Sequence, residues 1–142
     1  MANQKYTQVI DLVAGGWFNW QTDAVLGILV KDASYSAGHK KLSEVQGQQV
    51  ATTQIQGRAV HEGGQCMGYP AIFQTINGDT DYQLVLVQDL HDGDPNVLAF
   101  YDTGEDDGPL HLEHTGTFIV RPGLDDPLPE GTSSSARLWM RL

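Results

Sequence analysis

The apolar run at residues 25–30 constrains the fold of this 142-residue chain more than any other stretch. It is long enough for a strand buried on both faces, but a free-standing buried helix needs about ten residues or more. Gly27 lies inside the run, where a missing side chain indicates a bulge or a close neighbouring backbone. Trp17, Phe18 and Trp20 precede it, and each can remove ~150–250 Å² from water. We therefore predict a strand here, with the three aromatic residues anchoring the early core.

The rest of the chain shows short apolar runs separated by turn residues, which is typical of an antiparallel β-sandwich or small barrel. Residues 5–14 are the exception, because their apolar side chains at helical spacing and the following Gly15-Gly16 predict one short helix. Residues 34–48 are expected to form a one- or two-turn helix or an ordered loop, with Tyr35 packed back on the core. The predicted strands cover residues 24–31, 50–61 (one bent strand or two short ones), 66–76, 82–88, 96–101, 110–112 and 115–121.

Two hairpins are expected within this series. Asn77-Gly78-Asp79 is the strongest hairpin signal, because Asn-Gly accepts the positive φ angles of a primed turn. Residues 110–112 and 115–121 should form a last hairpin. The result is one β-domain at residues 1–122. Its predicted core is centred on Trp17, Leu26, Leu29, Leu84, Leu86, Leu98 and Phe118.

Charge and cysteine content limit the possible partners. Eighteen acidic and eight basic residues give a net charge of −10, which disfavours nucleic acid and anionic membranes because phosphate binding needs clustered Lys and Arg. A charged partner is expected to be basic. Cys66 is the single cysteine and is predicted to be a small buried hydrophobe. The N-terminus resembles no signal peptide, so we expect synthesis and retention in the cytoplasm of the producing cell.

Several polar clusters are candidates for catalytic or metal sites. His111-Leu112-Glu113-His114 matches no zinc spacing. Neither acidic loop, with Asp89, Asp92 and Asp94 or with Glu105, Asp106 and Asp107, supplies the glycine and glutamate that an EF-hand needs in order. Nucleophile-elbow, Walker and dinucleotide motifs do not occur. We expect no catalytic residue, no metal and no cofactor.

The C-terminal segment has a different composition. Residues 122–135 are rich in Pro, Gly and Ser and are predicted to be a linker, which places residues 123–142 outside the β-domain. The following apolar segment needs a surface that buries it, and we expect it to be an assembly arm that docks on a neighbouring subunit. The alternative is one more strand of the chain's own sheet. The predicted partner-binding residues are Arg137, Leu138, Trp139, Met140, Arg141 and Leu142.

Six features carry a resemblance to a known family. The first is the predicted N-terminal helix, and the others are Trp20-Gln-Thr-Asp23 running into residues 25–30, Tyr35, His39 with Leu42-Ser-Glu-Val45, residues 97–102 and Gly116–Val120. In this pattern, over about residues 5–122, the chain resembles small structural proteins of tailed-bacteriophage virions. It departs from them in having Gln-Ile-Gln-Gly at residues 54–57, where they have a Gly-rich aromatic strand, and in the Pro-rich C-terminal extension.

This resemblance implies a non-enzymatic building block of a virion, on the capsid surface or near the neck or tail. Its partners would be other virion proteins and further copies of itself, with neither nucleic acid nor membrane. A receptor- or carbohydrate-binding module at the tail is the alternative, and it should show an exposed aromatic residue in a concave loop cluster.

Overall fold

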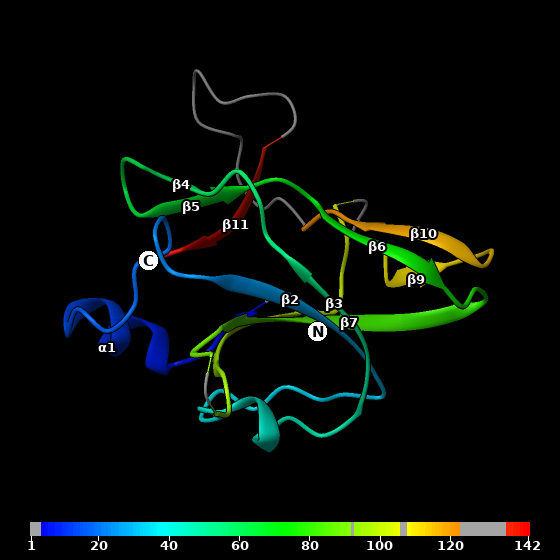
Figure 1. Cartoon of the computed structure of the whole chain (residues 1–142), viewed down its shortest axis with the longest axis horizontal. Coiled ribbons are helices and arrows are strands. Elements are labelled where there is room, and N and C mark those ends of the chain that lie inside the picture. The colour runs from blue at the N-terminus through cyan, green and yellow to red at the C-terminus, as the bar shows by residue number, and fades with distance from the viewer. Residues whose placement is uncertain (1–3, 92, 106–107, 123–135) are drawn as a thin grey trace.

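The computed structural model describes residues 4–91, 93–105, 108–122 and 136–142. Over these ranges the chain is mostly strand, with one short α-helix and one 3₁₀ turn, and every strand pair is antiparallel (Figure 1). The elements are β1 (Gln4–Lys5), α1 (Gln8–Ala14), β2 (Val25–Lys31), η1 (Leu42–Glu44), β3 (Gln48–Gln54), β4 (Ala59–His61), β5 (Gln65–Gly68), β6 (Ala71–Ile76), β7 (Thr80–Gln88), β8 (Asn96–Tyr101), β9 (Leu110–Leu112), β10 (Gly116–Val120) and β11 (Arg137–Arg141).

The main sheet is built around the apolar run of β2. Its strands lie in the order β1-β8-β7-β2-β3, and β9 pairs with the first part of β7. In the register of β2 with β7, Leu29 lies opposite Leu84 and Ile28 opposite Val85. These four side chains are buried, so the prediction of a strand covered on both faces is confirmed.

Each face of this sheet has its own apolar cluster. Because successive side chains of a strand alternate, Leu29, Leu84 and Leu86 enter the larger cluster. Ile28 and Val85 point the other way, into a second cluster with Tyr6 and Leu42. The larger cluster is covered by the two smaller sheets, β10-β6 and β11-β5-β4. Figure 1 shows both above the main sheet, with the η1 loop below it. The all-β, sandwich-like architecture is therefore as predicted.

Most of the predicted core is buried, but Trp17 was assigned wrongly. Five of its members are buried: Leu29, Leu84, Leu86, Leu98 and Phe118. Leu26 is half-buried, and Trp17 is 75% exposed. The chain turns outward at Trp17, whose ring lies against Gly15, and only Phe18 and Trp20 enter the core. The helix is also shorter than predicted, because Lys5 belongs to β1.

Both predicted hairpins are wrong. β6 pairs with β10 and β7 pairs with β2, so Asn77-Gly78-Asp79 carries the chain from one sheet to another. Residues 113–115 do the same between β9 and β10. Neither Asn77 nor Gly78 has a positive φ, whereas Asp79 does (54°). The Asn-Gly-Asp sequence suits any tight turn between two strands. Which strands then pair is determined by the packing of their side chains in the core.

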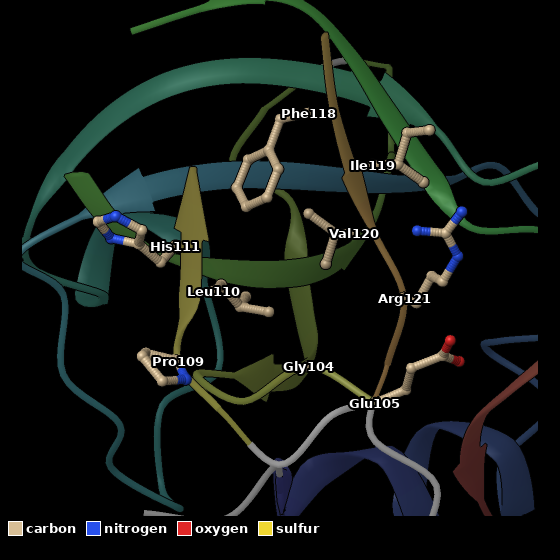
Figure 2. A pocket seen from close by; sticks show the side chains of 9 residues that line it. All are labelled: Gly104, Glu105, Pro109, Leu110, His111, Phe118, Ile119, Val120 and Arg121. Carbon is tan, nitrogen blue, oxygen red and sulfur yellow. The ribbon is translucent and has the colours of Figure 1, made fainter. Parts of the chain in front are cut away.

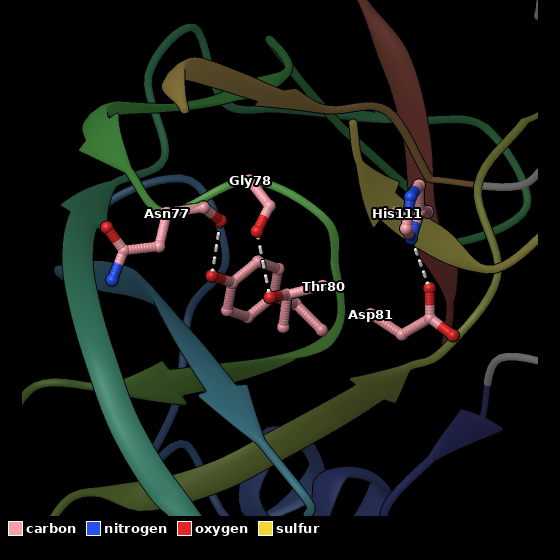
Figure 3. Close-up of polar contacts among 6 residues, drawn as sticks. Asn77, Gly78, Thr80, Asp81 and His111 are labelled. Atoms are coloured by element: carbon pink, nitrogen blue, oxygen red, sulfur yellow. Dashed lines mark hydrogen bonds and ion pairs between the residues drawn. The ribbon is translucent and has the colours of Figure 1, made fainter. Parts of the chain in front are cut away.

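These two corners are hydrogen-bonded to each other. Gly78 N donates to Thr115 Oγ1 (2.9 Å) and Asp79 N to the Glu113 carbonyl (3.1 Å). Figure 3 shows the polar contacts on the β6–β7 side, where the buried Tyr82 hydroxyl donates to the Asn77 carbonyl (2.7 Å). The contacts fix the point at which the small β10-β6 sheet joins the main sheet.

Replacement of Gly78 by alanine is expected to destabilise this junction. An added Cβ would lie 2.4 Å from the Thr115 backbone nitrogen, and relieving such overlap costs about 1–3 kcal/mol. Gly38→Ala is the control, since a Cβ there has no atom within 4 Å. Urea denaturation should show a lower free energy of unfolding for Gly78→Ala alone. Equal values for the two variants would contradict the packing of the two corners.

Candidate functional site

The predicted partner-binding segment is a strand of the chain's own fold. β11 pairs with β5, with Leu138 opposite Met67 and Met140 opposite Cys66. Leu138, Trp139 and Met140 are buried. The Trp139 ring packs edge-on against Tyr101 with centroids 5.3 Å apart, and the Tyr101 hydroxyl donates to the Trp139 carbonyl.

The expected assembly arm is therefore wrong, and the alternative of an extra strand is correct. The physical reason is that the apolar side chains find a complementary surface within the same chain, above β5 and Tyr101. Arg137 forms an ion pair with Glu105 (Nε–Oε2 2.8 Å), while Arg141 and Leu142 lie at the exposed end of the strand. The predicted linker falls mainly on residues 123–135, which lie outside the described residues.

Cys66 lies on β5, directly opposite Met140 of the neighbouring β11, and has no solvent-exposed surface. Burial raises the pKa of its thiol from 9.0 to about 12, because a thiolate is poorly solvated inside the core. The unfolded thiol ionises first as pH rises. The stability linked to this group is thus present below pH 9 and is lost between pH 9 and about 12.

The Cys66 thiol is accordingly expected to resist chemical modification in the folded protein. At pH ~8, near the ordinary pKa of a thiol, a soluble disulfide reagent should label it far more slowly than it labels the same chain in urea. The measurement is the rate of thiol release with and without denaturant. Similar rates in both conditions would show that β11 does not cover Cys66.

The described members of the polar clusters do not gather into a metal site. In the ranges that the structure describes, His, Cys, Asp and Glu nowhere form a group of three that could hold an ion. His111 Nδ1 contacts Asp81 Oδ1 (2.6 Å) at the exposed end of β9 (Figure 3). Asp94 accepts hydrogen bonds from the backbone and hydroxyl of Ser43. Asp92, Asp106 and Asp107 lie outside the described residues.

A pocket of about 250 Å³ lies between β9 and β10 (Figure 2). Leu110, Phe118 and Val120 form its apolar part, and Glu105 and Arg121 stand at its rim. Glu105 is already neutralised by Arg137. The pocket marks where β9 and β10 separate to join different sheets, and it is somewhat smaller than the ~300–1,000 Å³ typical of ligand sites.

A more distinctive surface covers the outside of β3, β6 and β10. These strands contain no Asp, Glu, Lys or Arg, although the chain has eighteen acids and eight bases. β10 pairs with β6, and β6 lies next to β3. We name their exposed side chains the uncharged face. It consists of Gln48, Gln49, Val50, Thr52 and Gln54 of β3, Ile72, Gln74 and Thr75 of β6, and Thr117 and Ile119 of β10.

At the centre of the uncharged face, Ile72 and Ile119 are direct cross-strand partners. They are 48% and 38% exposed, whereas their neighbours Phe73 and Phe118 point into the core. Side chains opposite each other in an antiparallel pair have Cβ atoms ~4.5–5.5 Å apart. The two isoleucines therefore form one continuous apolar spot in water. The sequence analysis missed this face, although the charge-free runs at residues 45–57 and 63–78 could have indicated it.

A second exposed apolar feature is the loop that follows α1. Trp17 projects into solvent, and the loop is held by Gln88, whose side-chain amide donates to the Trp17 carbonyl (2.9 Å). Arg58 binds the Trp20 carbonyl from the other side (2.8 Å). Beside the loop lies a shallow pocket of about 280 Å³. It is lined by Val13, Gly16, Phe18, Asn19, Trp20, Val60 and Leu142.

The chain matches no known family model, no curated protein and no solved structure. No helix in the described part of the chain is long and apolar enough to cross a membrane.

Proposed function

We propose that this chain is a non-enzymatic structural subunit of a tailed-phage virion, and that it binds other virion proteins through the uncharged face. The observation that supports this is the charge-free outer surface of three neighbouring strands, with the exposed Ile72 and Ile119 pair at its centre. The cores of protein interfaces are depleted in charged residues and enriched in apolar ones.

The cost of leaving this face in water supports the same proposal. Burial of an isoleucine side chain contributes about 1.5–3 kcal/mol, and a chain with eighteen acids could easily have placed a charge there. Edge strands, such as the two strands of the β10-β6 sheet, are often protected by such charges. A surface that lacks them is suited to being covered in an assembly.

The test is the protein composition of tailed particles purified from the source that encodes the chain. Quantitative mass spectrometry should find the chain in a fixed ratio to the major capsid protein. Its absence from washed particles would refute a virion role. Particles assembled with Ile119→Glu in place of the native chain should lose the subunit, since a charge would enter the buried contact.

Trp17 supports a second candidate function, the binding of a carbohydrate receptor. Its ring is 75% exposed, and its chain neighbours Gly16 and Phe18 line a pocket. Exposed aromatic faces stack on the apolar faces of sugars. A glycan array should then give a ligand whose binding is lost in Trp17→Ala. Failure of the native chain to bind any glycan would exclude this candidate.

A further inference from the structure

The distribution of charge identifies a partner for the uncharged face. We infer that a second copy of this chain binds there, so that the Ile72 and Ile119 pairs of two copies face each other across a two-fold axis. This inference rests on the proposed function, because it assigns the partner of the same face. A two-fold contact brings the same patch of both copies together. Because the patch is uncharged, this contact places no like charges opposite each other.

Electrostatic repulsion makes this face the favourable site of self-contact. Each copy carries a net charge of −10, so approach through the acidic loops brings like charges together. Two acids flank these strands in the sequence: Asp79, at the corner that follows β6, and Glu113, at the corner that precedes β10. Between these corners and Arg121, the outward side chains of β6 and β10 are neutral. Two copies can therefore touch here without burying a charge.

The size of the face sets the expected strength of the contact. The hydrogen-bonded pair of β6 and β10 has six and five residues, and at ~4.8 Å between strands and ~3.3 Å per residue it spans roughly 10 by 20 Å, to which the exposed side of β3 adds. The contact therefore covers a few hundred Å² per copy, below the ~800 Å² typical of stable complexes. We expect a weak, reversible dimer that becomes strong only when many copies are held together in a particle.

Salt dependence distinguishes this contact from one made of ion pairs. Raising NaCl from about 0.1 to about 1 M shortens the Debye length from ~10 to ~3 Å, which screens the repulsion between the two acidic copies. Sedimentation velocity of the full chain over a concentration series should therefore show more dimer at the higher salt. An interface made of ion pairs would show less dimer at the higher salt concentration.

Two variants with the same added charge test the location. Ile72→Glu and Ile10→Glu each add one acid at an exposed isoleucine, but Ile10 lies on α1, outside the uncharged face. Ile72→Glu is expected to raise the dissociation constant at least about tenfold, since an interfacial like-charge juxtaposition costs several kcal/mol. Ile10→Glu should behave as the native chain.

The inference is overturned if the native chain stays monomeric at every concentration and salt, or if both variants weaken the dimer equally. The first result would leave the virion role intact as long as Ile119→Glu still prevented incorporation into particles. A dimer that depends on Ile72 in a chain absent from particles would support the self-contact and refute the virion role. Circular dichroism of each variant checks that the fold is preserved.

Discussion

A chain shortened by residues 136–142 is expected to be unfolded at room temperature. The deletion removes Leu138, Trp139 and Met140 from the core, and burial of each contributes about 1.5–3 kcal/mol. It also exposes Cys66 and removes the acceptor of the Tyr101 hydroxyl. The sum approaches the ~5–15 kcal/mol by which whole domains are stable.

Circular dichroism and thermal denaturation of the shortened chain measure this effect. Removal of Leu142 alone is the control, because this side chain is partly exposed and its loss should cost less than about 1 kcal/mol. A shortened chain with a near-native melting temperature would show that β11 is dispensable. That outcome would restore the assembly-arm hypothesis.

Trp20→Ala is expected to lower the free energy of unfolding by about 3–5 kcal/mol, as large aromatic truncations in cores do. Trp20 is buried in the main cluster, and its indole N–H donates to the Met67 carbonyl (2.9 Å). Trp17→Ala, three residues earlier, should change the free energy of unfolding by no more than about 0.5 kcal/mol, because the Trp17 ring is in solvent.

Urea denaturation of the two tryptophan variants under identical conditions makes the comparison. The same substitution is made in each case, so the difference reports the burial of the Trp20 ring together with its hydrogen bond to Met67. A large loss in Trp17→Ala would mean that its ring is covered in the native protein. A small loss in Trp20→Ala would contradict the position of the main cluster.

The main sheet could be predicted from sequence because its evidence is local. Residues 25–30 and 84–87 are continuously apolar. A run of this length is too short for a buried helix and favours a strand buried on both faces. The two clusters on opposite sides of β2 and β7 are the direct result. Phe18 and Trp20 also entered the core as expected.

Strand partners could not be predicted, because they depend on residues far away in the chain. Asn77-Gly78 signals a tight turn, but the choice of β10 as the partner of β6 rests on Phe73 and Phe118 reaching one core. The C-terminal strand shows the same limit. Its apolar composition required a surface that buries it, and composition does not say whether that surface belongs to the same chain or to another.

The candidate site was missed for a different reason. Sequence motifs consist of reactive or ligand-binding residues, whereas the uncharged face is defined by the absence of charged residues. Its strands are far apart in sequence, at 48–54, 71–76 and 116–120, and only the fold brings them side by side.

The pairing of β11 with β5 has a consequence for the kinetics of folding. Arg137 lies opposite Gly68, and at the other end of the chain Gln4 lies opposite Phe100. The first closure joins segments separated by about half of the chain, and the second joins segments separated by about two thirds of it. Closing such long loops costs entropy before the contacts form. Domains with such high contact order fold in roughly milliseconds to seconds. The β11-β5-β4 sheet cannot form until residue 141 has been synthesised. Until then the nascent chain leaves Cys66 and Met67 without their β11 partners, and chaperones can bind this exposed apolar segment.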